Sequence, residues 1–157
     1  MYKHILLPLD GSKLAETAIP HAESLAKGCA TEDITLIRVV EHTEGYRKVV
    51  DPSKQPEEQV VTEPVSREER EAKTYLDGMV KKLLERGINT RGQVVIGDAA
   101  QAIIYHAEHN PCDIIVMASH GRSGISRWTL GSVADKVFRA STTPVLMVRA
   151  PGNMPGA

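Results

Sequence analysis

The sequence predicts a doubly wound α/β domain, in which a five-stranded parallel sheet carries helices on both faces. Two observations support this prediction. Short apolar runs alternate with longer segments of helical periodicity along the chain, which is the pattern of repeated strand–helix units. The apolar runs are also nearly continuous, as is typical of strands covered on both faces. We therefore expect a Rossmann-like domain with the strand order 3-2-1-4-5.

Five apolar runs are predicted to be strands. Each is short, and most are rich in Ile, Leu and Val, which favour extended structure. The last run follows Pro144, a residue that a strand tolerates at its start. In chain order the predicted strands are residues 5–9, 34–40, 94–96, 114–117 and 145–148.

The first predicted helix follows Ser12, whose side chain suits the N-cap position. Gly28 suits the end of that helix, because glycine readily adopts the left-handed conformation found there. Pro20 lies inside the pattern and is expected to kink the helix. The buried stripe is expected to hold Leu14, Ala18, Ala22, Leu25 and Ala26.

Three further helices are predicted from capping signals and apolar periodicity. Ser66 and Glu69 have the spacing of a capping box, and Gly87 is expected to end the helix that they begin. Asp98 and Ser132 are expected to open the other two helices in the same way. The expected inward residues are Ala72, Leu76, Met79, Val80 and Leu83, then Ala99, Ile103 and Ala107, then Val133, Val137 and Phe138.

The predicted domain spans residues 1–149 and contains one segment without a steady period. Residues 42–65 are polar and contain prolines. A connection of this length is either a mobile loop or a functional lid, and the sequence does not decide between them. Residues 150–157 are expected to form a flexible tail.

Composition restricts the classes of function. The chain has 157 residues, of which 41% are hydrophobic and 25% charged, with a formal net charge of −1. These values are ordinary for a globular domain, and they argue against a nucleic-acid partner. The sequence shows no secretory leader pattern and no apolar run of membrane-spanning length. Cys29 and Cys112 lack the spacing of a metal site, so we expect a cytoplasmic protein without a membrane partner.

Two histidines, His106 and His109, lie three residues apart on a predicted helix. A metal ion can use this spacing, but a third ligand is not apparent in the sequence. We therefore expect both side chains to lie on a solvated face.

Residues 117–133 have the composition of a phosphate-binding loop. The segment follows an apolar strand, carries three glycines and two arginines, and reaches Gly131 and Ser132 at the start of a helix. Glycine lets backbone N–H groups approach an anion, and a helix N-terminus offers unpaired donors. If the first and fourth strands are neighbours, Asp10 faces this loop. Asp10 then either accepts hydrogen bonds from ribose hydroxyls or an adenine amine, or serves only a turn.

Two common nucleotide-binding motifs are absent from the sequence. No Gly-Lys-Ser/Thr sequence occurs, which disfavours a P-loop NTPase. Leu9-Asp10-Gly11-Ser12, after the first strand, lacks the G-x-G-x-x-G fingerprint of nicotinamide dehydrogenases. A glycine-rich loop after the fourth strand requires a different nucleotide-binding fold.

Three separated motifs resemble those of the universal stress protein family, in its single-domain, ATP-binding form. The family motif is glycine, two residues, glycine, nine residues, glycine, and then Ser or Thr. Here Ala118-Ser119-His120-Gly121 is followed by nine residues and then Gly131-Ser132, so only the first glycine differs. Residues 5–12 and 144–148 resemble the family's first and last strands. The resemblance covers residues 2–149, and residues 42–65 match least.

The resemblance implies a cytoplasmic protein that binds ATP, or AMP or ADP, and acts as a nucleotide-dependent regulatory or protective module in stress response. Mg²⁺ is expected to bridge the phosphates, and a homodimer is expected to form through the last strand, Val145–Val148, whose open edge invites pairing. The resemblance places adenine near Pro8, Leu9, Asp10 and Val39, and ribose and phosphates near Met117, Ala118, Gly121, Gly131, Ser132 and Val133. His120 and Arg122 are further candidates for phosphate contact, with an ordinary loop or surface role as the alternative for each.

Two alternative functions remain open on the sequence. The same site could hydrolyse ATP slowly, although we identify no catalytic residue and no dedicated metal ligands. The chain could instead be a dimeric interaction module with impaired nucleotide binding, for which Ala118 is the only support. Alanine at this position is unfavourable if the backbone needs a positive φ or if the methyl crowds the ribose, and it is harmless if the backbone is extended.

Overall fold

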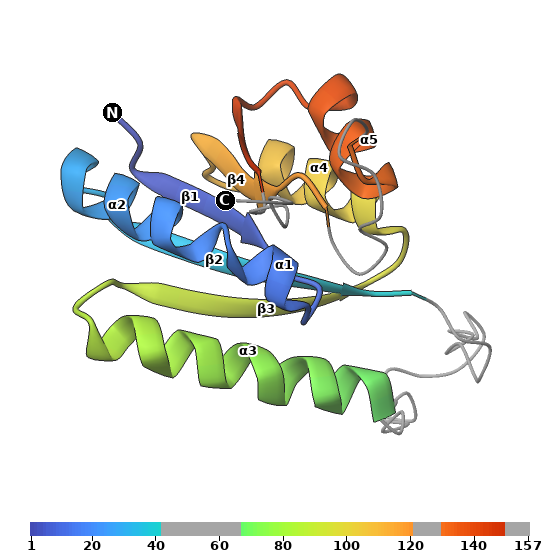
Figure 1. The fold of residues 1–157 in the computed structure, drawn as a ribbon, viewed down its shortest axis with the longest axis horizontal. Coiled ribbons are helices and arrows are strands. Elements are labelled where there is room, and N and C mark those ends of the chain that lie inside the picture. The colour runs from blue at the N-terminus through green and yellow to red at the C-terminus, as the bar shows by residue number, and fades with distance from the viewer. Residues whose placement is uncertain (42–66, 121–129, 150–157) are drawn as a thin grey trace, which may run out of the picture.

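The computed structural model describes residues 1–41, 67–120 and 130–149, in which strands and helices alternate (Figure 1). The strands are β1 (His4–Pro8), β2 (Asp33–Val40), β3 (Thr90–Ile96), β4 (Ile114–Ala118) and β5 (Val145–Val148). The helices are α1 (Lys13–Glu16), α2 (Ile19–Cys29), α3 (Arg67–Glu85), α4 (Ala99–His109) and α5 (Ser132–Ala140).

The strands form one parallel sheet with the order β3-β2-β1-β4-β5, which confirms the predicted topology. β1 is central: its Leu6 lies opposite Thr35 of β2 on one side and Ile115 of β4 on the other. The chain order reverses between β1 and β4. The loops that leave these two strands therefore run to opposite faces and open a crevice at the carboxyl ends of the strands.

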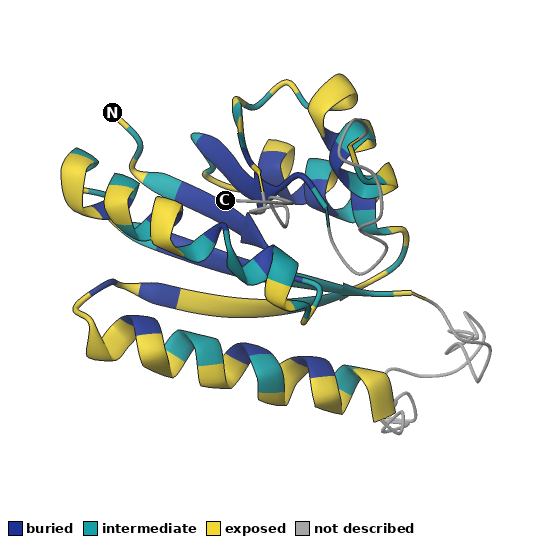
Figure 2. Ribbon diagram, in the orientation of Figure 1, coloured by how far each residue is buried: buried dark blue, intermediate teal, exposed yellow. Residues whose placement is uncertain are grey.

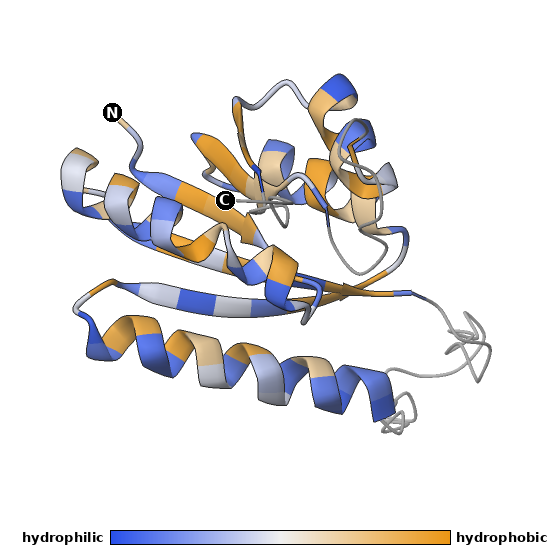
Figure 3. Cartoon of the chain, in the orientation of Figure 1, coloured by the Kyte–Doolittle hydropathy of each residue, from blue (hydrophilic) through white to orange (hydrophobic). Residues whose placement is uncertain are grey.

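Apolar side chains pack on both faces of the sheet. One cluster joins the sheet to α1, α2 and α3 and includes Leu7 and Leu76. The other joins the sheet to α4 and α5 and includes Leu6, Ile103 and Val137. Figure 2 shows β1 and β4 largely buried, and Figure 3 shows the same strands as strongly hydrophobic. Burial on two faces explains why the apolar runs of the sequence are continuous.

The first helical segment differs from its prediction. The Ser12 hydroxyl accepts a hydrogen bond from the Ala15 amide at 3.1 Å, as expected of an N-cap. The helix that it caps is a single turn, however, and α2 starts anew with Pro20 in its first turn, where a missing N–H leaves no bond unmade. Pro20 therefore separates two helices rather than kinking one. Gly28 lies inside α2, and Ala30 takes the left-handed end position with φ 50°.

Three predictions of burial or exposure on the later helices are wrong. At the start of α4 the buried alanine is Ala100, while Ala99 is half-buried. On α5 Phe138 is 55% exposed. Val137 already faces the core, and the next residue on a helix is rotated by more than a quarter turn. His106 is only 8% exposed, so it is buried instead of facing solvent.

Two of the remaining helix signals are confirmed and one is wrong: α5 begins at Ser132, but its N-cap is Gly131, and the Ser132 side chain does not cap it. Asp98 caps α4, accepting a hydrogen bond from the Gln101 amide at 2.9 Å. Gly87 follows the end of α3 with φ 76°. Ser66, residues 42–65 and residues 150–157 lie outside the described residues. None of the described helices is long and apolar enough to cross a membrane.

Candidate functional site

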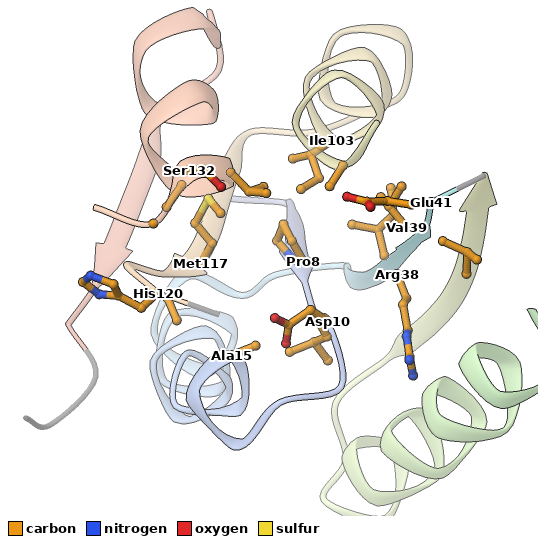
Figure 4. A pocket seen from close by; sticks show the side chains of 18 of the residues that line it. Pro8, Asp10, Ala15, Arg38, Val39, Glu41, Ile103, Met117, His120 and Ser132 are labelled. Atoms are coloured by element: carbon orange, nitrogen blue, oxygen red, sulfur yellow. The ribbon is translucent and has the colours of Figure 1, made fainter. Parts of the chain in front are cut away.

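A cavity of about 500 Å³ opens at the carboxyl ends of β1, β2 and β4, beside the start of α5 (Figure 4). This is the crevice that the strand order creates, and its volume lies within the range of roughly 300–1,000 Å³ typical of small-molecule sites. Every predicted site residue that the structure describes lines it: Pro8, Leu9, Asp10, Val39, Met117, Ala118, His120, Gly131, Ser132 and Val133. Gly121 and Arg122 lie outside the described residues.

The Asp10 turn forms one wall of the cavity. An Asp10 carboxylate oxygen accepts a hydrogen bond from the Ser12 amide at 2.8 Å. Gly11 has φ +86°, a conformation that side chains rarely adopt. Asp10 therefore does form the turn that the sequence suggests, and it also lines the cavity. A carboxylate has several acceptor sites, so the turn bond leaves it able to accept others.

The start of α5 forms the opposite wall. Gly131 occupies the N-cap position and supplies no side-chain cap. Its amide donates to the Ser119 carbonyl at 2.8 Å, and its carbonyl accepts from the Asp135 amide at 2.8 Å. The first N–H groups of α5 therefore carry the partial positive charge of a helix N-terminus beside the cavity, without a capping side chain. This arrangement suits an anion.

Ser119 and His120 connect β4 to this wall. The Ser119 hydroxyl and His120 Nδ1 are 3.0 Å apart and share a hydrogen bond. His120 Nε2 is buried, and it has no hydrogen-bond partner in the structure as described. A buried polar atom without a partner is unfavourable unless a ligand or water completes it. His120 lines the cavity, but its Nε2 is buried away from it, and Figure 4 shows the ring directed away from the other labelled side chains.

Ala118, the departure from the family motif, lies at the end of β4. It pairs with Val148 of β5 and is 6% exposed. Ala30 is the sole non-glycine residue with a positive φ among those that the structure describes, so Ala118 does not need glycine's conformational freedom. The backbone argument for impaired binding therefore fails.

Other residues of the cavity were not found from the sequence. Ala15, Ile37, Ile103 and Ala134 add an apolar lining, and Arg38, Val40, Glu41, Glu68, Glu71 and Ala99 complete it. Glu68 and Glu71 are expected to be exposed at the start of a helix, and they are; the fold brings that helix start to the rim of the cavity. The signal that could have found Arg38 and Glu41 is their place beside Val39 at the end of β2.

The described residues contain no group of three or more His, Cys, Asp and Glu side chains arranged to hold a metal ion. Cys112 is partly buried, and burial raises the pKa of its thiol to about 11. It is therefore protonated at neutral pH and a poor nucleophile.

Comparison with known proteins gives consistent results along the chain. A model of the universal stress protein family matches residues 1–149. Universal stress protein MJ0577 of Methanocaldococcus jannaschii is 32% identical, over 95% of this chain and 96% of that protein. Universal stress protein YxiE of Bacillus subtilis is 30% identical, over 95% of this chain and all of that protein, 100%.

Solved structures agree with the sequence matches. The structure of MJ0577 has a TM-score of 0.78 and 30% identity, covering 98% of this chain and 99% of that chain. The crystal structure of a universal stress protein in complex with cAMP has a TM-score of 0.68 and 19% identity, covering 96% of this chain and 98% of that one. The second similarity shows the common fold.

Proposed function

Because the chain belongs to the universal stress protein family, we propose that its cavity binds an adenine nucleotide, ATP, ADP or AMP. Occupancy of the cavity then regulates the partners or the protective action of the protein during stress in the cytoplasm. The observation that carries this proposal is the N-terminus of α5, which has no side-chain cap and lies beside the same cavity as the Asp10 carboxylate. The cAMP complex of a fold neighbour supports the choice of an adenine nucleotide.

Different parts of the cavity wall suit different parts of the nucleotide. Pro8, Leu9 and Val39 provide an apolar surface for the adenine ring. Asp10 accepts hydrogen bonds from the ribose hydroxyls. The phosphates lie against the start of α5, where Ser132 and the backbone N–H groups donate to them. Figure 4 shows Asp10 and Ser132 on opposite sides of Pro8, which leaves the middle of the cavity for the sugar.

Mg²⁺ enters this proposal with the nucleotide. Magnesium retains several waters and is usually held by phosphates and one or two carboxylates rather than by an all-protein cage. The lack of a three-ligand cluster among the described residues therefore fits a metal carried by ATP. When bound, the ion would neutralise part of the phosphate charge.

Nucleotide release and calorimetry test the proposal. Purified protein is denatured and the released small molecules are chromatographed, and stripped protein is then titrated with ATP, AMP and GTP. We expect an adenine nucleotide in the released fraction, or heat of binding with ATP or AMP that exceeds the heat with GTP. Ala118→Gly is the companion variant and is expected to bind like the wild type. No released nucleotide and no heat at millimolar ATP would contradict the proposal.

We further propose a homodimer that pairs through β5. The strand lies at the edge of the sheet, and an open edge is a template for pairing with a second copy. Leu146 on this strand is 36% exposed and Phe138 on α5 is 55% exposed. Leu146→Glu places a charge on the proposed interface, and we expect it to shift the mass measured by light scattering from dimer to monomer. A wild-type protein that is monomeric at all concentrations would overturn this part.

A further inference from the structure

Arg38 covers the turn that carries Asp10. Its guanidinium lies over Gly11, so a β-carbon built on that glycine would be 3.2 Å from Arg38 Nη1 and 3.3 Å from Arg38 Cζ. Gly11 is left-handed, with φ +86°, and glycine has more backbone freedom than any other residue. The guanidinium occupies the space in which a side chain at this position would lie.

Arg38 is itself held by Tyr75 of α3. Arg38 Cζ is 5.1 Å from the centre of the Tyr75 ring, a cation–π distance. The Tyr75 hydroxyl donates to a Glu16 carboxylate oxygen at 3.1 Å, and Glu16 pairs with Lys13 at 2.9 Å. Burial, followed by Glu16, raises the pKa of Tyr75, so the hydroxyl remains a donor at neutral pH. These contacts tie β2, α3 and α1 together behind the turn.

We propose that Arg38, clamped against Tyr75, is a positioning residue of the cavity. It holds the turn formed by Asp10, Gly11 and Ser12 so that Asp10 meets the ribose hydroxyls. In Figure 4 Arg38 extends from β2 toward α3 rather than across the cavity, as a residue acting through the turn would. The effect of Arg38 on ligand binding rests on the proposed nucleotide function. Its effect on the turn in the ligand-free protein does not.

The first experiment uses the ligand-free protein. Amide hydrogen exchange is measured at Ser12, whose N–H donates to Asp10, in wild type, Arg38→Met and Arg86→Met. Arg86 is the matched control, because this arginine directly after α3 also makes a contact between elements, with Glu23 of α2, and it does not line the cavity. We expect exchange at Ser12 to rise roughly tenfold in Arg38→Met and to stay unchanged in Arg86→Met. Equal exchange in Arg38→Met and wild type would overturn the proposal.

The second experiment separates positioning from general damage to the site. Dissociation constants are measured for ATP and for 2′,3′-dideoxy-ATP, which lacks the ribose hydroxyls that Asp10 would bind. We expect Arg38→Met to weaken ATP roughly tenfold and to leave the dideoxy analogue close to its wild-type affinity. A merely structural role for Arg38 would weaken both nucleotides equally, and that result would refute the inference. A wild type that binds neither nucleotide contradicts the proposed function instead, and the exchange result then decides on Arg38.

Two Tyr75 variants test the same contact without changing Arg38, so the proposal can still be tested if Arg38→Met does not fold. Tyr75→Phe keeps the ring face beneath the guanidinium and loses only the bond to Glu16, so it is expected to retain most of the preference for ATP over the dideoxy analogue. Tyr75→Leu removes the ring face and is expected to behave like Arg38→Met. The same behaviour in both Tyr75 variants would show that the ring does not hold Arg38.

Discussion

Polar groups at the two ends of the parallel sheet differ in how they are paired. At the amino-terminal ends of the strands, polar groups pair with one another. An Asp113 carboxylate oxygen accepts from the backbone amides of Lys3 at 2.7 Å and His4 at 2.9 Å. Asp33 contacts His4 Nδ1 at 3.1 Å and pairs with Arg91 at 2.9 Å. This end is satisfied by the chain itself.

At the carboxyl ends the corresponding groups face a cavity. The start of α5 has no side-chain cap, and the Asp10 carboxylate lines the same cavity. Unmade bonds at a buried site reduce stability, so such groups are retained where something other than folding uses them. The polar contacts at the amino-terminal ends of the strands therefore stabilise the sheet, while the carboxyl ends are available for a ligand. Changes at one end should therefore affect folding, and changes at the other should affect binding.

The largest expected effect is a loss of ligand binding at the carboxyl end of the sheet, without a loss of stability. Ser132→Asp places a negative charge at the first residue of α5. We expect nucleotide affinity to fall about a hundredfold, because like charges placed together cost several kcal/mol. An acidic residue in the first turn is favourable for the helix, so the melting temperature should not fall. Calorimetry and thermal unfolding measure the two effects, and Ser24→Asp on α2 is the control. Loss of stability without loss of binding would reverse our assignment of the two ends.

The next effect concerns the turn between the cavity and Arg38. Gly11→Ala forces a β-carbon into a positive-φ residue and against the Arg38 guanidinium. We expect the free energy of unfolding to fall by about 1–2 kcal/mol. Gly78→Ala on α3 is the matched variant, since nothing lies within 4 Å of its added β-carbon. It is expected to raise stability by roughly 0.5–1 kcal/mol, measured by urea unfolding. Effects of the same sign in both variants would contradict the role of the Gly11 conformation.

A smaller effect tests the satisfied end. Asp113→Ala removes the acceptor for the Lys3 and His4 amides. We expect the free energy of unfolding to fall by about 1 kcal/mol, while nucleotide affinity is unchanged. The backbone bond from His4 lowers the Asp113 pKa, so the stabilisation is present above its unfolded pKa and is lost as pH falls through the folded value. A clear loss of affinity in this variant would show that the two ends are not independent.

The smallest effect is a pH dependence from His106. Burial, and then the charge of Arg91, lower the His106 pKa from its usual 6.5. The unfolded chain therefore binds the proton first, and stability declines as pH falls from 6.5 toward the folded pKa. We expect His106→Leu to flatten the stability profile between about pH 7 and 5. His109→Gln, at an exposed position, is the control. A wild-type slope in His106→Leu would assign the pH dependence to another group.

The sheet and the cavity wall at α5 were predictable because their signals are local. Continuous apolar runs locate the strands, and Gly131-Ser132 after a strand marks a helix start beside a crevice. Phe138 and Ala99 were misplaced because helical periodicity defines a stripe but not its edges. The break before Pro20 depends on how α1 packs, which periodicity does not report.

The Arg38 clamp was not predictable from the sequence. Gly11, Arg38 and Tyr75 are far apart along the chain, and each has an ordinary local environment. Only the pairing of β1 with β2 and the packing of α3 against the sheet bring them together. Contacts between segments that are distant in sequence carry no local pattern. For the same reason the sequence does not show that Glu68 and Glu71 lie at the cavity.

Mapping backbone amide shifts during an ATP titration tests the central claim most directly. We expect shifts at Asp10 and Ser132, which line the cavity, and at Ser12 and Ser119, which are hydrogen-bonded to residues that line it. Lys3, His4, Asp33 and Asp113 at the opposite end of the sheet are expected to remain unmoved. Saturable shifts confined to the first group would locate the nucleotide at the carboxyl ends of the strands. Saturable shifts at the second group, or no shifts at saturating ATP, would contradict the account.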